Sequence, residues 1–309
     1  TWSAVQQTLQ RFDVTDTQQL RDFDPEAIPD TPLLHIANNI LAIGDKTVIN
    51  QEYLDSAKRW YASDLGRVPV DDAKAALDAW ANLHTGGLIK ESAINVTPLT
   101  RLVVQNALLF AARWADPFEA GDTVEGAPFT RADRSTSRAD LMSRVGPFAL
   151  ATGPGWRALR LPCNDGRATG APTLAMDIIL PDKVVSPAVL PPSTWGEATA
   201  ALTAAASEQQ VALKLPKLDL ASGVMDLFPV LAAVGVELGS LDHIAEGISA
   251  SQAAQQVRLV VDEEGTVAAA LTEIGIEASA VDHSGAVAFI VDHPYVLRIV
   301  DLASGVAII

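Results

Sequence analysis

Residues 263–272 read Glu-Glu-Gly-Thr-Val-Ala-Ala-Ala-Leu-Thr, and this segment constrains the fold more than any other. An acidic turn leads into a flexible glycine and then into side chains that are too small to build a core of their own. Such a segment suits a strand that slides between two others, because its side chains obstruct neither neighbour. We therefore predict that residues 263–272 form a hinge for strand insertion.

The order of residue types from Thr266 onward also fits a strand in the middle of a sheet. Alternate side chains of a strand point to opposite faces. The face directed into the core would carry only small or apolar residues: Thr266, Ala268, Ala270, Thr272, Ile274, Ile276 and Ala278. The other face would carry both charges: Val267, Ala269, Leu271, Glu273, Gly275, Glu277 and Ser279. No proline lies between Gly265 and His293, so every backbone N–H there can join a sheet.

Length and composition argue against several classes of protein. The 309 residues, 49% of them hydrophobic, are enough for a sizeable core. A net charge of −16 argues against nucleic acid and anionic membrane surfaces as partners, because phosphates would repel the chain. No apolar run is long enough to predict a membrane-spanning helix. The single Cys163 excludes an intramolecular disulfide, and we expect it to be a small buried side chain.

Helical periodicity marks the first part of the chain, beginning with a short amphipathic stretch at Thr1–Leu9. Residues 50–63 place four side chains on one face: Tyr53, Leu54, Ala57 and Tyr61. Residues 70–84 predict a second helix, with two aspartates at its start, the inward side chains Ala76, Leu77 and Trp80, and a stop at Thr85-Gly86-Gly87.

The period changes at residues 100–112, an almost continuous apolar run that predicts a central strand buried on both faces. Further strands are predicted at 156–161, 174–180, 210–220 with a bend at Pro216, 256–262, 286–291, 295–300 and 306–309. Residues 226–234 predict a short helix. Without a repeat or a linker-like break, residues 1–309 read as one mixed α+β domain.

Nine motifs succeed one another along the chain. They are Trp80 with Thr85-Gly86-Gly87; Thr100, Leu102-Val103-Val104, Asn106-Ala107, Phe110 and Trp114; Pro117-Phe118; Leu161-Pro162-Cys163; Ile178-Ile179-Leu180-Pro181-Asp182; Leu215-Pro216-Lys217-Leu218; Ile244-Ala245-Glu246-Gly247-Ile248-Ser249; the hinge at 263–272; and Asp292-His293-Pro294-Tyr295. No single motif is specific. In this order, they resemble the serpin family over essentially the whole chain.

The resemblance implies an α+β serpin fold with three β-sheets, surrounding helices and an exposed reactive-centre loop at about residues 265–290. The chain departs from the family pattern in three places. The usual first two helices, with their Phe-Ile-Ser-Pro-x-Ser motif, precede the point where this chain starts, so we expect them to be lacking. Gln255 stands where the family usually has histidine, and the last strand stops before the usual Gly-Arg-Val.

The implied function is suicide inhibition of a serine protease. The protease attacks the loop and forms an acyl-enzyme through its own nucleophilic serine. The cleaved loop then inserts into the central sheet, and deacylation fails because a displacement of even ~1 Å can cost ~100-fold in rate. The resemblance implies that the protein itself is not an enzyme, needs no cofactor or metal, and acts as a monomer. We expect an extracellular protein; no signal peptide is visible, so a cytoplasmic location stays open.

By resemblance, the hinge consists of Glu263, Glu264, Gly265, Thr266, Ala268, Ala269, Ala270 and Thr272. The scissile bond would be Ser279–Ala280. The loop is longer than usual, so Ala280–Val281 and a bond near His283–Ser284 stay open. No Lys or Arg lies between Gly265 and Leu297, which argues against a trypsin-like protease and favours an elastase-like or subtilisin-like one.

Trp114, Lys217 and Glu263 match family positions where the loop enters the sheet. Breaking one side of a buried Lys–Glu contact there would cost ~3–5 kcal/mol. Asn106 and Gln255 match positions that control sheet opening. Two of these residues have a simpler reading, since Trp114 can be an ordinary core aromatic and Asn106 a polar group with local partners.

Two other functions compete with inhibition. An enzyme lacks support, because the chain has no Gly-x-Ser-x-Gly elbow, P-loop, dinucleotide glycine pattern or His-Glu-x-x-His motif. Asp282-His283-Ser284 holds triad residue types, but adjacent residues do not adopt triad geometry. The stronger alternative is a non-inhibitory serpin-like binding or structural protein, supported by Gln255 and by Val267 where the family prefers Glu. The intact small-residue hinge favours inhibition.

Overall fold

A computed structural model of the chain describes residues 17–309 except 25–26, 46, 165–172, 206, 222–223, 234, 237–238, 257 and 267–284. The predicted stretch Thr1–Leu9 lies outside the described residues. So do most of the reactive-centre loop and six predicted site residues: Ala268, Ala269, Ala270, Thr272, Ser279 and Ala280.

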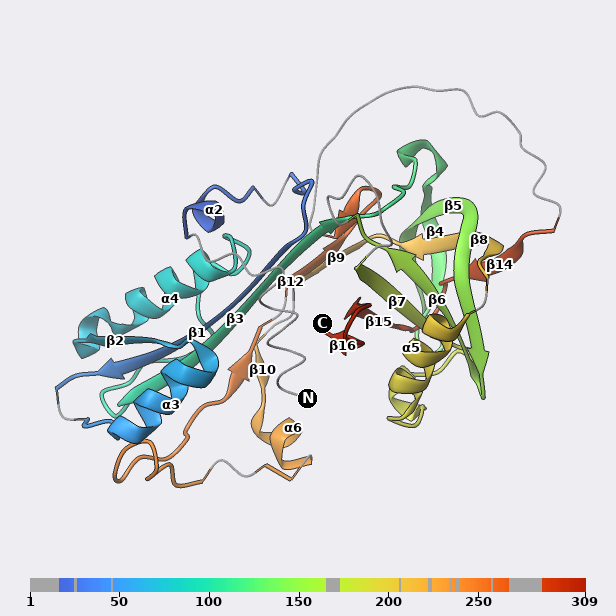
Figure 1. Cartoon of the computed structure of the whole chain (residues 1–309). Helices are drawn as coiled ribbons and strands as arrows, with labels where there is room; N and C mark the ends of the chain where they lie inside the picture. Colours follow the sequence, from blue (N-terminus) through green and yellow to red (C-terminus); the bar gives the residue numbers. More distant parts are fainter. Residues whose placement is uncertain are drawn as a thin grey trace.

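A six-stranded sheet forms one half of the molecule (Figure 1). Its strand order is β2 (Asp64–Val68), β1 (Leu33–Ile43), β3 (Leu102–Arg113), β13 (Gly265–Thr266), β12 (Arg258–Val261) and β9 (Leu218–Ala221). β1 and β3 pair antiparallel from Leu33 opposite Ala111 to Ala42 opposite Leu102. β2 runs parallel to β1 at the outer edge.

Helices lie against this sheet: α2 (Thr17–Arg21), α3 (Gln51–Tyr61) and α4 (Ala73–His84). α3 begins where the Asn50 side chain accepts a hydrogen bond from the Glu52 N–H at 3.0 Å. The predicted helix at 70–84 starts with a 3₁₀ turn, Val70–Asp72, and continues as α4. Apolar side chains of α4 pack on the sheet in a cluster formed by Leu41, Ile43, Ala73, Leu77 and Val103.

The prediction that residues 100–112 are buried on both faces is correct only for the second half of β3. Leu109, Phe110, Ala111 and Ala112 are all buried. In the first half, Val104 is 56% exposed and Asn106 is exposed, while the alternating residues Val103, Gln105 and Ala107 are buried. The reason is that α4 covers one face there, whereas α3 reaches the other face with its last residue, Tyr61, whose carbonyl accepts a hydrogen bond from Asn38 Nδ2 at 2.9 Å. β1, which no sequence pattern predicts, is the long partner of this strand.

The other half of the molecule is an eight-stranded sheet (Figure 1). The order is β14 (Val287–Ile290), β8 (Gln209–Pro216), β5 (Thr136–Gly153), β6 (Trp156–Pro162), β7 (Leu174–Pro181), β15 (Val296–Asp301) and β16 (Val306–Ala307), with β4 (Val124–Thr130) paired to β5. α5 (Thr194–Ala204) covers β5, β6 and β7. Short 3₁₀ turns lie at Ala120–Asp122 and Pro187–Val189.

A third, two-stranded sheet pairs β10 (Met225–Asp226) with β11 (Ala254–Gln255) near α6 (Phe228–Ala233). The expectation of an α+β fold with three sheets and surrounding helices is therefore confirmed. The main core joins the two large sheets, and its fully buried members include Trp114, Phe148, Met176 and Phe289. Cys163 is also fully buried, which raises the pKa of its thiol to about 12.

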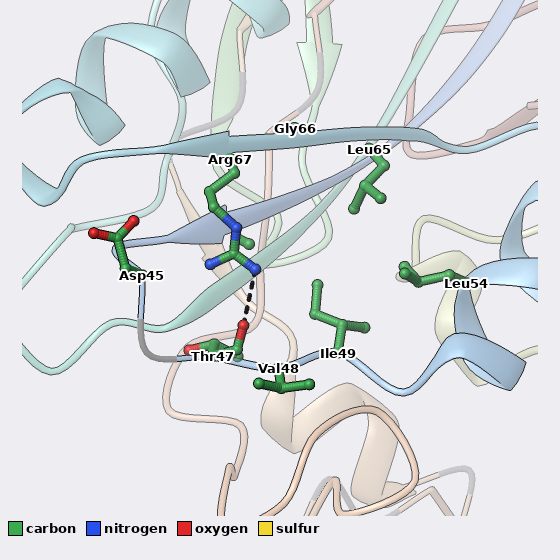
Figure 2. A pocket seen from close by; sticks show the side chains of 9 residues that line it. Asp45, Thr47, Val48, Ile49, Leu54, Leu65, Gly66 and Arg67 are labelled. Atoms are coloured by element: carbon green, nitrogen blue, oxygen red, sulfur yellow. Dashed lines mark hydrogen bonds between the residues drawn. The ribbon is translucent and has the colours of Figure 1, made fainter.

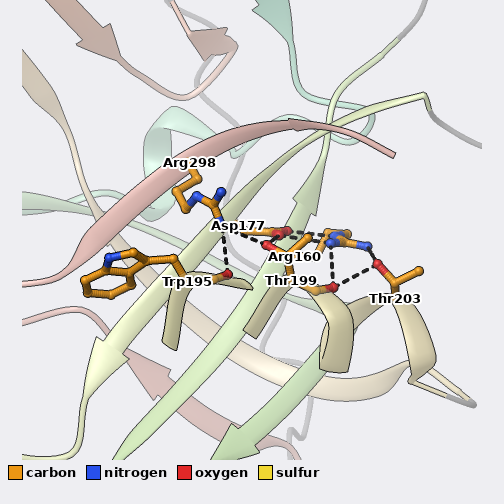
Figure 3. A network of polar contacts seen from close by, with 6 residues as sticks. All are labelled: Arg160, Asp177, Trp195, Thr199, Thr203 and Arg298. Carbon is orange, nitrogen blue, oxygen red and sulfur yellow. Dashed lines mark hydrogen bonds and ion pairs between the residues drawn. The ribbon is translucent and has the colours of Figure 1, made fainter. Parts of the chain in front are cut away.

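A buried ion pair fastens α5 to the eight-stranded sheet (Figure 3). Arg160 donates to both carboxylate oxygens of Asp177, from Nε at 2.7 Å and from Nη2 at 2.9 Å. Thr199 of α5 donates its hydroxyl to Asp177 Oδ2 at 3.0 Å, and Arg298 donates to the Trp195 carbonyl at 2.7 Å. Asp177 has no exposed surface, so its carboxylate relies on Arg160 and Thr199 instead of water.

In the part of the chain that the structure describes, no helix has the length and apolar character needed to span a membrane. The same part contains no group of three or more His, Cys, Asp or Glu residues in a metal-binding arrangement.

Candidate functional site

The first two hinge residues that can enter the sheet are already inside it. Gly265 and Thr266 form β13, which lies between β3 and β12. Thr266 pairs antiparallel with Ala112 on one side and with Val261 on the other, and Gly265 lies opposite Arg113. The chain therefore leaves β12, reverses direction within a few residues, and returns between the same two strands.

The reversal is held by Asp262. Its Oδ1 accepts hydrogen bonds from the Glu264 N–H at 2.9 Å and the Gly265 N–H at 3.1 Å. Its own N–H donates to the Gly265 carbonyl at 2.9 Å. An aspartate that binds the backbone two and three residues on is a common way to stabilise a tight turn. The geometry explains why the acidic turn immediately precedes the glycine.

Gly265 is required by space rather than by backbone conformation. A Cβ atom at this position would lie 2.2 Å from the Ala112 carbonyl oxygen and 2.8 Å from the Arg113 Cα. Both atoms belong to the backbone of β3, which cannot move without disrupting the sheet. Only glycine therefore allows the hinge to enter at this level.

Thr266 is 1% exposed, as its place in the inward-facing set predicts. Its hydroxyl has no hydrogen-bond partner among the described residues. An unsatisfied buried hydroxyl costs about 1–3 kcal/mol. The inserted position of Thr266 thus carries an energetic cost that the surrounding contacts must offset.

Glu263 connects the turn to two distant segments. Its carboxylate contacts Lys217 Nζ at 2.7 Å and accepts a hydrogen bond from the Thr123 hydroxyl at 2.7 Å. The Glu263 side chain is 13% exposed and that of Lys217 39% exposed. Burial raises the pKa of Glu263, but the hydrogen bonds from Lys217 and Thr123 outweigh it, so the pKa lies below its ordinary value.

Trp114 also stabilises this turn, through two hydrogen bonds. Its indole Nε1 donates to the Asp262 carbonyl and its backbone N–H to the Glu264 carbonyl, both at 2.8 Å. Its side chain is 1% exposed and belongs to the main core. Trp114 is therefore both a core aromatic and a direct support of the hinge. Next to it, Arg113 Nη1 contacts the Glu264 carboxylate at 2.8 Å.

Trp114, Lys217 and Glu263, here called the gate cluster, lie where the two large sheets meet. Lys217 is the single residue between β8 of the eight-stranded sheet and β9 of the six-stranded sheet. Trp114 comes directly after β3 and forms a β-bridge to Cys163, which comes directly after β6. The bend predicted at Pro216 is thus the point where the chain passes from one sheet to the other.

The two remaining predicted site residues are not brought together. Asn106 lies on β3, where its Nδ2 donates to Asn38 Oδ1 at 3.0 Å and to the Ala37 carbonyl at 3.3 Å. Gln255 lies outside the six-stranded sheet, exposed on β11 opposite Met225. In the predicted strand at 256–262, the residues from Arg258 to Val261 form β12 of the six-stranded sheet. A role of Gln255 in sheet opening stays a prediction.

Three residues that shape the site are not among those predicted from the sequence: Asp262, Thr123 and Arg113. The spacing Asp262-Glu-Glu-Gly265 is a turn signal that identifies the first. Arg113 closes a strand and has no local signal for its contact with Glu264. Thr123 comes from an irregular segment 140 residues away from Glu263, and nothing in the local sequence points to it.

A cavity of about 420 Å³ lies away from the gate cluster, between β2 and α3 (Figure 2). Its apolar side is formed by Val48, Ile49, Leu54 and Leu65. Arg67 at its other side donates to the Gly44 carbonyl at 2.5 Å and the Thr47 carbonyl at 2.8 Å. The guanidinium thus already serves to hold the loop after β1.

The sequence pattern of one family, described as Serpin (serine protease inhibitor), matches residues 4–309. Serpin B11 of Homo sapiens is 27% identical over 263 residues, covering 77% of this chain and 63% of that protein, so the match spans less than two thirds of its length. The leukocyte elastase inhibitor of Bos taurus is 29% identical over 288 residues, covering 86% and 73%. Human thyroxine-binding globulin, in complex with its ligand, superposes with a TM-score of 0.71 at 18% identity, covering 94% and 76%. The chain belongs to the serpin family.

Proposed function

We propose that this serpin inhibits a serine protease of elastase-like or subtilisin-like specificity by loop cleavage and insertion. The observation that carries the proposal is the position of β13, where Thr266 is paired on both sides within the sheet and Gly265 is paired with β3. Insertion of the rest of the hinge would extend a strand that has already begun. The bovine relative named as a leukocyte elastase inhibitor supports the small-residue specificity.

The register of β13 extends this argument to the rest of the hinge. Thr266 lies opposite Ala112, and each further hinge residue would move one position back along β3. Thr272 would then lie opposite Asn106, and Ile276 opposite Leu102, where β3 begins. Directly opposite residues of an antiparallel pair share a face. Ala268 would thus point, with the buried Phe110, into the main core, whereas Thr272 would share the face of the exposed Asn106.

The contacts of the gate cluster favour insertion that begins at the first residues of the hinge. Glu263 and Glu264, at the start of the hinge, are held by contacts with Lys217, Thr123, Trp114 and Arg113. The start of the hinge is therefore fixed while the loop beyond it is to be cleaved. A protease that cuts at Ser279–Ala280, or at the neighbouring bonds Ala280–Val281 or near His283–Ser284, would release the far end of the loop only. Insertion would then proceed from the fixed end.

The test is incubation with elastase, subtilisin and trypsin, followed by denaturing electrophoresis. We expect an SDS-resistant complex with the first two enzymes, and a cleavage site within residues 278–284. Clean cleavage of the loop without a complex would contradict inhibition.

A non-inhibitory binding protein is the second candidate. Val267, where the family prefers Glu, favours it, as does the same fold in a globulin named for binding thyroxine. The two functions differ in their response to nicking of the loop. An inserting loop raises the melting temperature sharply, because it adds a paired central strand, whereas a loop that stays outside leaves it unchanged.

A further inference from the structure

The hairpin between β4 and β5 ends in a tight turn that carries exposed arginines. Thr130 and Thr136 close the ladder, and the Arg131 N–H donates to the Ser135 carbonyl at 2.8 Å. Arg131, Arg134 and Arg138 are all exposed. With Asp133 as the single acidic residue among 131–138, the tip carries a net charge of +2 in a chain whose total is −16.

Arg134 adopts a backbone conformation that disfavours any side chain. Its φ is +67°, in the left-handed region, and among the described residues only Ala62 shares a positive φ without being glycine. Glycine would take this position at no steric cost. A residue kept in an unfavourable conformation at an exposed site points to a use for its side chain.

Asp133, the acidic residue of this turn, already accepts hydrogen bonds from within the turn. Asp133 Oδ1 accepts from the Ser135 N–H at 2.9 Å and from the Ser135 hydroxyl at 2.6 Å. These hydrogen bonds from Ser135, together with the charge of Arg131, lower the pKa of Asp133. Arg138 donates to the Gly126 carbonyl, whereas no ion pair to Arg131 or Arg134 is found within the described ranges. Both guanidinium groups at the tip are therefore available to a partner.

The hairpin lies beside the chain that returns from the reactive-centre loop. The Thr130 N–H donates to the Asp292 carbonyl at 2.8 Å, two residues after the end of β14. β4, β5 and β14 are drawn at the same end of the molecule in Figure 1. A protease bound at the Ser279–Ala280 bond would contact the chain seven residues before β14 begins at Val287. The tip would then be within reach of the protease surface.

We propose that Arg131 and Arg134 form an accessory docking site for carboxylates on the surface of the target protease. This inference rests on the proposed function, since it needs a protease at the loop. The two guanidinium groups would attract an acidic patch beside the protease active site and speed its encounter with the loop. Such rim charges act mainly on the association rate and lose their effect as salt is added.

The test compares the Arg131→Gln/Arg134→Gly variant with a control, Lys58→Gln/Arg59→Gln, which removes the same charge from α3. The probe is subtilisin, native and with its lysines succinylated, so that its surface becomes acidic while its small-residue specificity is kept. The readout is the second-order rate of loop cleavage. Arg134→Gly relieves the backbone, so we expect an unchanged or higher melting temperature, and a lower rate would not reflect misfolding.

With succinylated subtilisin at low salt, we expect the tip variant to be cleaved roughly 5- to 10-fold more slowly than the wild type. The loss should shrink below about twofold in about 0.3 M salt, with native subtilisin, and in the α3 control. Equal losses with both forms of the protease, or no loss, would overturn the docking site. A loss of binding to dextran sulfate without any change in cleavage rate would overturn it in favour of a polyanion site.

The cleavage rate reports on docking whether or not the protease is trapped. Absence of an SDS-resistant complex would contradict the proposed function, yet the rate comparison would still decide the role of the hairpin.

Discussion

Two charged networks in this molecule differ in how deeply they are buried. Arg160 and Asp177 are 9% and 0% exposed beneath α5, with two direct hydrogen bonds between them. Lys217 and Glu263 at the gate cluster are 39% and 13% exposed, with a single contact. A buried bidentate pair is costly to break, whereas a partly solvated pair exchanges protein partners for water at a small cost. The Arg160–Asp177 pair is therefore suited to a permanent structural contact, and the Lys217–Glu263 pair to a contact that can be released.

The largest effect is expected from Asp177→Asn. The substitution leaves the Arg160 charge buried beside a neutral group, so the free energy of unfolding should fall by about 3–5 kcal/mol. Urea denaturation measures it, and Asp182→Asn, at an exposed position just after β7, is the matched control. A loss no larger than that of the control would show that the pair is not a permanent joint.

Gly265→Ala should have the next largest effect. Its Cβ would collide with the Ala112 carbonyl oxygen, so β13 must leave the sheet at a cost of about 1–3 kcal/mol. Because β13 would no longer be paired, insertion could not start from a strand already in the sheet. We therefore expect the yield of protease complex to fall at least about tenfold. Gly121→Ala, which meets open space, is the control. Unchanged trapping in Gly265→Ala would contradict entry at this position.

A smaller effect is expected from the exposed network. Glu263→Gln and Lys217→Met should each lower the free energy of unfolding by about 1 kcal/mol, well below the value for a fully buried pair. The double variant should lose less than the sum of the two single variants. Because the pKa of Glu263 is depressed, its contribution is present above the unfolded pKa and is lost as the pH falls through the folded value. A pH-independent difference between wild type and Glu263→Gln below pH ~5 would contradict this contribution.

The smallest effect is expected at the end of α4, where His84 Nδ1 and His35 Nε2 are 2.9 Å apart and both side chains are buried. Burial lowers the pKa of His84, the charge of His35 lowers it further, and Asp64 opposes the shift. The unfolded chain therefore binds the proton first, so stability should decline as the pH falls below ~6.5. Urea midpoints at mildly acid and neutral pH should differ less in His84→Gln than in the wild type. An unchanged difference would exclude His84 as its source.

The sequence predicts the fold best where periodicity is local. The helices predicted at 50–63 and 70–84 and the apolar strand predicted at 100–112 agree within a few residues with α3, α4 and β3. β1 escapes prediction because His35, Asn38 and Asn39 interrupt its apolar pattern, and its pairing partner is distant in sequence. Its formation is decided by the contact with β3 rather than by its own residues.

The candidate site is less accessible from the sequence, because its contacts join distant segments. The family resemblance suggests Lys217 and Glu263, and the structure has them in contact. It also suggests Gln255 at the opening, whereas the chain runs through the β10–β11 ribbon there. Hydrogen bonds such as Thr123 to Glu263 depend on how two irregular segments meet, which a local pattern does not encode.

The paired position of Gly265 and Thr266 bears on the kinetics of the proposed mechanism. A strand that enters a sheet from solution must first find its register, and bringing its ends together costs conformational entropy before any contact forms. Here the register is already set by Ala112 and Val261. After cleavage the inserted strand would therefore propagate without a nucleation step, so the rate of trapping should depend on how fast the following hinge residues pair with β3.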